Sequence, residues 1–447
     1  MADIKAGFFS TGFYAYPMEI ISGRADKARQ ALQGTRIEVT NVADPVVTDA
    51  DIPRAVAQLK QGADYDLIVC CVSTWTESPK TVGVLREFRD IPVVIWSLGG
   101  YTQNGSLVSP ASAAGATAAR PMLEAMGIKY KMIYDPPDAP PNAAAVEDFA
   151  IVAKAARRLR EGRIGLLGYA DMGLYTTMFN GPRLRDQIGV EVESFDMLQV
   201  EQAAAEAPAE QVEALVKDMR SRWTFEQEPS DADLERLARI YIAIKKRADE
   251  RNYVAFSPKC VQGMGPSMKF VPCMVLSMMG DEVHCTCECD APGALTQTML
   301  GSVSGQTTTF LEWYEFWPDR ILGGVCGFVP FGMVDGPITV RRHGWGGFTG
   351  LINTSQMKEG RITLARLITM GDKMRMHIVT GYGHRPRSWQ ELGWVPPAPR
   401  FPGLEVTLDI PVSEFGEKVG AQHYAITYGD YSARLRELCR LLDIEVI

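Results

Sequence analysis

The chain has 447 residues, with 54 acidic and 46 basic side chains and a formal net charge of −8. Hydrophobic residues make up 46% and charged residues 22%, which excludes a wholly disordered protein. The length allows about three domains of ordinary size. Nucleic-acid binding relies on clustered Lys and Arg, so the acidic balance argues against nucleic-acid partners and against an anionic membrane surface.

The first residues lack the basic start and apolar core of a signal peptide. No apolar run approaches the ~20 residues that cross a bilayer, and the most apolar run, Leu67–Val72, has the length of a strand. Nine cysteines are an odd number, and two of them, Cys70 and Cys71, lie within that run. We therefore expect reduced cysteines and a cytoplasmic protein without membrane partners.

Apolar strand-like runs alternate with helical patterns from the N-terminus to about residue 160. Continuous apolar strands between helices are typical of a parallel sheet covered on both faces. The proline-rich stretch Asp135–Pro141 is a stiff connector to the last helix of this segment. Strands are expected at Ile4–Phe9, Arg36–Thr40, Asp66–Val72 and Val93–Ser97, and helices at Ala25–Leu32, Ile52–Gln61, Ala111–Met126 and Val146–Arg160.

A second α/β segment begins at Arg163–Gly168, and a β-rich segment with frequent glycines begins at about Gly323. We therefore predict an α/β protein with two doubly wound parallel-sheet domains, residues 1–161 and 162–322, and a mostly antiparallel β-rich C-terminal domain, 323–447. Helices are expected at Gln202–Arg220, Asp231–Arg251 and Tyr431–Leu442. Strands are expected at Glu191–Phe195, Tyr253–Phe256, His284–Glu288, Thr307–Leu311, Ile338–Arg342, Arg361–Ile368, Met374–Thr380 and Glu405–Ile410.

The segment Cys285–Trp317 carries the strongest chemical signal. It is expected to fold as strand, helix and strand, with Glu288 and Glu312 at the C-terminal ends of their strands. A parallel crossover brings both ends to one edge of a sheet, where α/β proteins build their sites. Two carboxylates there can share a divalent cation or divide the roles of acid and base. The alternative is a pair of solvated glutamates, against which the aromatic run Trp313–Trp317 argues.

Three cysteines alternate with Thr, Glu and Asp in the run Cys285–Asp290. In a strand, residues two apart face the same side, so the cysteines would share one face and Glu288 would face the pocket on the other. Structural zinc sites use a wider cysteine spacing supplied by a turn. We therefore interpret Cys285, Cys287 and Cys289 as core residues rather than metal ligands.

His423, one of five histidines, lies near the C-terminus. A single histidine is often structural, but two glutamates and one imidazole suit Mn²⁺ or a similar divalent cation with open positions for substrate oxygens. Gly165–Gly168 lacks the dinucleotide-binding spacing, and no phosphate-binding loop or nucleophile elbow occurs. The small basic clusters Arg341–Arg342 and Arg385–Arg387 are solvated or hold an anionic substrate group.

Three motifs resemble the L-fucose/L-arabinose isomerase family: Cys287–Leu295, Phe310–Trp313 and Gln422–Asp430. The order of two α/β segments, a β-rich segment and a near-terminal histidine before a short helix also matches. The resemblance is specific from about Phe256 onward.

The resemblance implies a Mn²⁺-type ion held by Glu288, Glu312 and His423, with Glu312 in place of an aspartate that is common in the family. It also implies substrate contacts. Trp75 resembles a tryptophan that the first domain lends to the pocket of a neighbouring subunit, and Gln262 resembles a substrate-binding glutamine. Family members form hexamers, trimers or tetramers with sites at subunit boundaries, so a homo-oligomer is expected.

Two departures from the family bear on the substrate. Ser10–Tyr14 supplies no arginine after the first strand, and Gly324–Gly327 occupies the region where the arabinose-type branch has a further histidine ligand. Together with Lys259 and the arginine clusters, these differences leave room for a modified, even anionic, sugar. We place Lys259 and Gln422, which precedes the histidine of its motif, among the expected substrate-binding residues.

The activity implied by the resemblance is a metal-dependent aldose–ketose isomerase, an intramolecular oxidoreductase that works through a cis-enediol. The open-chain sugar would bind the cation through O1 and O2, with Glu288 and Glu312 as base and acid in either order. Two alternatives stay open. One is a catalytically silent sugar-binding protein, and the other is a metal–enediolate enzyme of another kind, such as an epimerase or aldolase.

Overall fold

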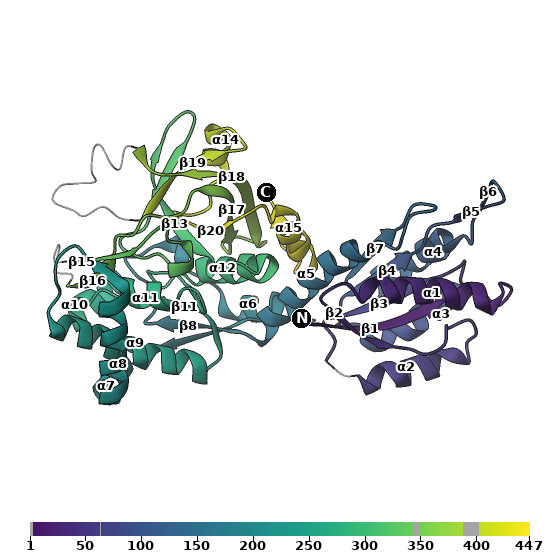
Figure 1. Ribbon diagram of the computed structural model, residues 1–447, viewed down its shortest axis with the longest axis horizontal. Coiled ribbons are helices and arrows are strands. Elements are labelled where there is room, and N and C mark those ends of the chain that lie inside the picture. The colour runs from purple at the N-terminus through teal and green to yellow at the C-terminus, as the bar shows by residue number, and fades with distance from the viewer. Residues whose placement is uncertain (1–2, 63, 344–348, 388–401) are drawn as a thin grey trace. The chain divides into compact units, whose positions relative to one another are not determined.

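The structure is a computed structural model that describes residues 3–62, 64–343, 349–387 and 402–447. The chain divides into two compact units, Met1–Arg157 and Arg158–Ile447 (Figure 1). The predicted fold class is confirmed, because the described residues form two main parallel sheets and a large, mostly antiparallel sheet. No helix in these ranges is long and apolar enough to span a membrane. The division into three domains at residues 161 and 322 stays a prediction.

The first unit is built on a parallel sheet. Its strands are β1 (Ile4–Thr11), β2 (Ile37–Asn41), β3 (Leu67–Val72), β4 (Val93–Ser97) and β7 (Tyr130–Tyr134). Its helices are α1 (Met18–Leu32), α2 (Asp51–Gln61), α3 (Ser78–Leu85), α4 (Ser112–Ala125) and α5 (Ala143–Glu161), the last of which continues into the second unit. The four strands and four helices predicted here are present, and β7 and α3 were not predicted.

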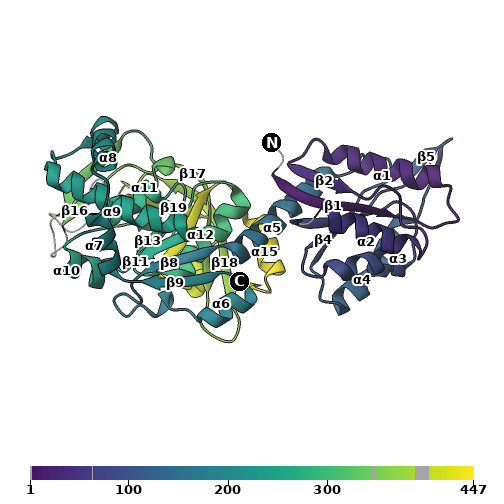
Figure 2. The same ribbon diagram turned by 90° about the horizontal axis from the view of Figure 1, so that it is seen from below.

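The strand order of this sheet is β2-β1-β3-β4-β7. Helix α1 lies on one face and α2, α3 and α4 lie on the other (Figure 2). Every residue of Leu67–Val72 is buried, because both faces of the central strand β3 are covered. The half-exposed residues of β7, an edge strand, explain why an apolar pattern did not predict it.

The second unit begins with a smaller parallel sheet of order β12-β11-β8-β9. Its strands are β8 (Arg163–Leu167), β9 (Glu191–Phe195), β11 (Tyr253–Pro258) and β12 (His284–Cys285). Helices α6 (Gly181–Gln187), α7 (Met197–Ala205), α8 (Ala209–Arg222) and α9 (Asp231–Glu250) lie between them in sequence. The helix predicted at Gln202–Arg220 is divided between α7 and α8, with Pro208 as the N-cap of α8. The chain reverses its direction across the sheet between β8 and β11, where such sheets bind ligands beyond the strands' carboxyl ends.

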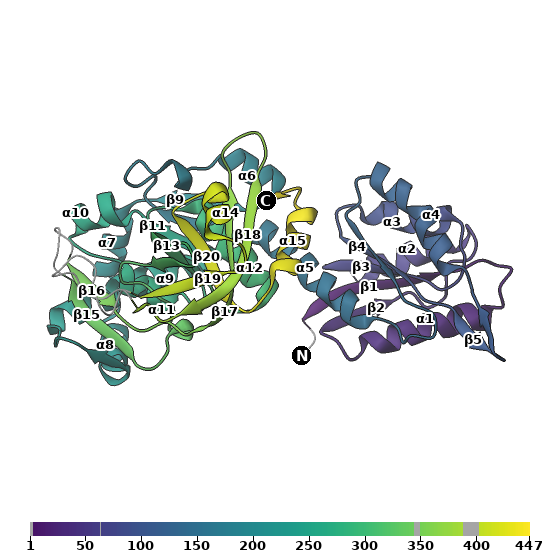
Figure 3. The same ribbon diagram turned by 90° about the horizontal axis from the view of Figure 1, so that it is seen from above.

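The large sheet has the order β17-β20-β13-β14-β19-β18-β21 and is antiparallel except at β21. Because β17 also pairs with β18, the sheet closes on itself (Figure 3). Its strands are β13 (Thr309–Phe316), β14 (Ile321–Gly324), β17 (Gly360–Ile368), β18 (Arg375–His384), β19 (Gly403–Leu408), β20 (His423–Tyr428) and β21 (Glu445–Val446). The further elements are β10 (Trp223–Phe225), β15 (Ile338–His343), β16 (Gly350–Asn353), α10 (Gly265–Met268), α11 (Cys273–Met279), α12 (Ala291–Ser304), α14 (Val412–Lys418) and α15 (Ser432–Leu441).

The predicted succession of strand, helix and strand is present, but the predicted parallel crossover is wrong, because β12 and β13 belong to different sheets. β12 ends at Cys285, and Glu288 and Cys289 have φ angles of 62° and 52°, so this segment is a turn. The chain turns here because Asp290 caps α12 by accepting a hydrogen bond from the Gly293 N–H. Helix α12 then contacts β11 and β12 as well as β17 and β20, and leads into β13 of the closed sheet (Figure 1). Glu312 therefore lies within an antiparallel strand.

Candidate active site

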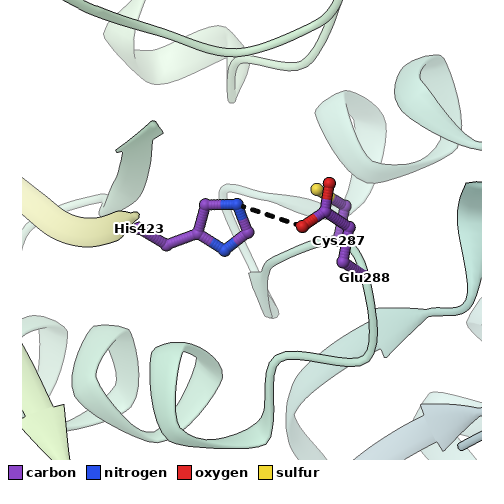
Figure 4. A group of neighbouring side chains, drawn as sticks. All are labelled: Cys287, Glu288 and His423. Atoms are coloured by element: carbon purple, nitrogen blue, oxygen red, sulfur yellow. Dashed lines mark ion pairs between the residues drawn. The ribbon is translucent and has the colours of Figure 1, made fainter. Parts of the chain in front are cut away.

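A carboxylate and an imidazole meet beyond the end of β12. Oε2 of Glu288 lies 3.4 Å from Nε2 of His423, the first residue of β20, and Figure 4 shows the two side chains pointing toward each other. The residues are 7% and 1% exposed. Neither atom has a hydrogen-bond partner within the described ranges. Buried polar atoms are nearly always paired in native proteins, so two orphaned atoms aimed at each other indicate a ligand site.

The orientation of His423 is fixed from its other side. Its Nδ1 lies 2.9 Å from Oδ2 of Asp290. Arg366, on β17, donates to both oxygens of Asp290 at 2.6 and 3.0 Å, and all three side chains are buried. Burial opposes ionisation of Asp290, but the Arg366 charge and the His423 hydrogen bond outweigh it and hold its pKa well below the ordinary range. An ionised Asp290 accepts only, so Nδ1 carries the hydrogen and Nε2 faces Glu288.

The surroundings shift the pKa of both members of the pair. Burial raises the pKa of Glu288 from 4.5 to about 7; the charge of His423 acts in the opposite direction, and Glu312, Asp171 and Asp290 add to the rise. Burial alone would lower the pKa of His423, but the hydrogen bond to Asp290 and the charges of Glu288 and Glu312 raise it. A carboxyl group such as Glu288, with a pKa of about 7, suits acid–base catalysis.

Glu312 lies beside the histidine. It is the partner of His423 across the antiparallel pair β13–β20, is half-buried, and acts electrostatically on both Glu288 and His423. The ligating atoms that come within 4.8 Å of one another are those of Cys287, Glu288 and His423. Cys287 is a buried core residue, as predicted, but it does not lie on a face opposite Glu288, because the strand ends before the alternation can apply.

Two other predicted substrate residues lie after β11, at the reversal point of the parallel sheet. Lys259 is half-buried, and its aliphatic stem packs so closely against Gly168 and Gly263 that a Cβ at either glycine would lie 2.9 Å from it. The backbone N–H of Gln262 donates to the buried carboxylate of Asp171 at 2.9 Å, while the Gln262 side chain is on the exposed side.

Gln422 and Trp75 occupy different surroundings. The Gln422 side-chain oxygen accepts a hydrogen bond from the Thr176 hydroxyl at 2.6 Å, and its Nε2 is buried without a partner in the described part of the chain. Trp75 belongs to the first unit, where it follows β3. Its ring packs edge-on against Phe13, with ring centroids 4.8 Å apart, beyond the carboxyl ends of β1 and β3.

Sequence reasoning missed Asp290, Arg366 and Asp171. The first could have been found, because an aspartate followed by Ala-Pro-Gly is typical of a helix N-cap and would have ended the preceding strand. Nothing in the sequence around Arg366 points to Asp290, because the two residues are 76 positions apart and meet only through the packing of α12 on β17.

The fold and this site define an enzyme with a buried carboxylate–imidazole pair at the edge of a parallel sheet. No model of a known protein family matches the chain. It is similar to a sulfoquinovose isomerase of Alkalicoccus urumqiensis, 23% identical over 80% of each chain. Sulfoquinovose isomerases of Priestia aryabhattai and Priestia megaterium are 20% identical over 100% of this chain and 99% of theirs. The predicted enzyme class, an isomerase, is thereby confirmed.

Proposed function

We propose that the protein is a metal-dependent aldose–ketose isomerase whose substrate is an anionic sugar, sulfoquinovose or a close relative of it. The observation that carries the proposal is the buried pair of orphaned atoms, Glu288 Oε2 and His423 Nε2, 3.4 Å apart. The names of the three similar proteins support the sugar. The more specific assignment to the L-fucose/L-arabinose isomerase family remains part of the proposal.

A divalent cation, Mn²⁺ or a similar ion, fits this donor set. Glu288 and His423 would hold it, with Glu312 supplying a further carboxylate from the neighbouring strand. Asp290 supports this role, because metal-binding histidines commonly donate their second ring N–H to a carboxylate. When bound, the cation would polarise the substrate carbonyl and stabilise negative charge on the enediolate oxygens.

The reaction moves one proton between carbons and one between oxygens. A carboxylate takes the proton from C2, which leaves a cis-enediol, and returns it to C1, while the O2 proton leaves and O1 gains one. We assign the carbon proton to Glu288, because its carboxylate is more deeply buried than that of Glu312. Glu312 is the candidate for the transfer between the oxygens.

The anionic substituent of the proposed substrate requires a positively charged side chain as its partner. Lys259 directly follows β11, the neighbour of β12, and Glu288 lies in the turn after β12. The Lys259 stem packs against two glycines. Among the described residues, Lys259 forms no ion pair. We assign the sulfonate-binding role to Lys259, with Gln262 and Gln422 as further hydrogen-bonding groups.

We also propose a cytoplasmic homo-oligomer in which Trp75 reaches a neighbouring subunit's site.

Turnover of a sugar panel tests the proposal. Protein stripped with chelator and resupplied with Mn²⁺ is incubated in D₂O with sulfoquinovose, glucose, L-fucose and D- and L-arabinose, and ketose formation is followed by NMR. We expect a cation-dependent ketose with deuterium at C1, and sulfoquinovose as the best substrate.

Glu288→Gln should abolish this turnover while the fold persists, and Glu315→Gln, an exposed glutamate of β13, is the matched control. Near-wild-type activity of Glu288→Gln would contradict the assignment. Binding of the sugars without any turnover would favour the silent sugar-binding protein instead.

A further inference from the structure

The turn that positions Glu288 also brings a thiol to the site. The Cys287 sulfur lies within 4.8 Å of ligating atoms of Glu288 and of His423, and Figure 4 shows it beside the Glu288 carboxylate. Successive side chains of an extended strand point to opposite faces. Here the left-handed backbone of Glu288, with φ of 62°, allows both side chains to approach His423.

We propose that Cys287 is a protein ligand of the cation in addition to Glu288 and His423, and that the site therefore prefers Co²⁺, Zn²⁺ or Fe²⁺ to Mn²⁺. The inference rests on the proposed function for the presence of a cation at Glu288 and His423. The buried orphaned atoms Glu288 Oε2 and His423 Nε2 converge on the same position as the sulfur. Thiolate with imidazole and one carboxylate suits borderline cations, whereas Mn²⁺ favours oxygen ligands.

This ligand set is compatible with a catalytic cation that also binds substrate. Catalytic sites for such cations commonly have three protein ligands and keep a further position for water or substrate. On coordination, the thiol loses its proton to solvent and the sulfur donates an electron pair to the cation, so no oxidant or reductant is needed. Without a cation, the thiols of Cys287 and Cys260 influence each other's pKa, and coordination of Cys287 would remove this influence.

Cobalt binding tests the inference directly. We expect Co²⁺ added to the stripped protein to produce a near-ultraviolet sulfur-to-cobalt charge-transfer band, and X-ray absorption of the wild-type Zn²⁺ protein to detect a sulfur at ~2.3 Å. The matched control is Cys285→Ser, because Cys285 is buried two residues earlier and its thiol donates to the Val283 carbonyl. The band should persist in Cys285→Ser and vanish in Cys287→Ser and in Cys287→Ala.

The cation affinities of variants distinguish the contribution of the Cys287 thiol from the contributions of Glu288 and His423. Cys287→Ser should weaken Zn²⁺ and Co²⁺ binding by at least the ~10- to 100-fold that loss of an outer-shell partner costs, and Mn²⁺ binding much less. Glu288→Gln and His423→Gln should lose all three cations. Binding that needs Glu288 and His423, but shows no sulfur in the wild-type spectra, would overturn the thiolate ligand and leave the proposed function intact. A wild-type protein that binds none of these cations would overturn both.

Discussion

Arg366 acts on the orientation of His423 through Asp290, which contacts both residues. Arg366 is 1% exposed and pairs with Asp290, which is 0% exposed and accepts from His423. A buried ion pair adds little net stability, but removing one partner leaves the other charge uncompensated. Arg366 also donates to the Thr176 carbonyl, so it connects the histidine to the segment after β8. It is a positioning residue, since it acts through Asp290.

Arg366→Met should therefore lower the free energy of unfolding by ~3–5 kcal/mol and weaken cation binding. Arg366→Lys should lose less, because it keeps the charge and loses only the bidentate geometry. The control is Arg361→Met on the same strand, whose ion pair with Asp409 is exposed and worth ~0–1 kcal/mol. Urea denaturation and cation titration measure both effects. Equal losses in Arg366→Met and Arg361→Met would contradict the role of the buried pair.

Glu288 makes the stability of the stripped protein depend on pH. Its pKa rises from 4.5 to about 7 on folding, so the folded state binds more protons between these values. Its stabilising contribution is present below pH 4.5 and is lost as the pH rises through 7. Glu288→Gln removes this dependence, and its stability relative to wild type should be higher at pH 8 than at pH 5. Urea unfolding at the two pH values measures this; a difference independent of pH would count against the buried carboxyl.

Helix α12 is the element that joins the two sheets of the second unit. It contacts the parallel sheet through β11 and β12 and the closed sheet through β17 and β20, and nearly all of its side chains are buried. Gly301 allows the closest approach, since a Cβ there would lie 2.3 Å from the His284 ring. That ring is held by a 2.8 Å hydrogen bond to Thr308.

Gly301→Ala should destabilise the protein by ~1–3 kcal/mol, because the packed ring of His284 must move. Gly416→Ala is the matched control. It lies inside helix α14, a Cβ there meets nothing within 4 Å, and alanine should stabilise the helix by ~0.5–1 kcal/mol. Thermal or urea unfolding of the two variants should give shifts of opposite sign. Two shifts of the same sign would show that Gly301 is not required for packing.

Elements were predictable where the pattern is local. The continuous apolar run of β3 and the helical composition of α9 needed no tertiary information. The same reasoning failed at Glu288, where a helix cap overrides β-like alternation, and at Glu312, whose partner on β20, His423, lies far along the chain. His423 was found through its motif, whereas Arg366 lies in a strand with no local signal.

At the scale of the whole molecule, each site of the proposed oligomer contains residues from two subunits. Trp75 is a residue of the first unit, whereas Glu288 and His423 belong to the second. If Trp75 completes the pocket of a neighbouring subunit, each of two inactive variants can supply the residue that the other lacks.

Trp75→Ala and Glu288→Gln should each be inactive, and refolding them together should restore part of the activity. Some mixed sites then combine an intact Trp75 with an intact Glu288. The control is a mixture of Glu288→Gln and His423→Gln, which must not recover, because both residues belong to one unit. Sedimentation measures the oligomeric state of each mixture. An active monomer, or no recovery in the first mixture, would contradict the shared site.

The position of β20 near the C-terminus also sets the order of events during synthesis. β20 lies between β13 and β17 in the closed sheet and carries His423, so both neighbours leave the ribosome before the strand that joins them. Contacts between distant segments form slowly. The nascent protein therefore acquires its parallel sheets first, and the proposed cation site is completed only when β20 is inserted. During refolding, recovery of cation binding should accordingly lag behind recovery of helical structure.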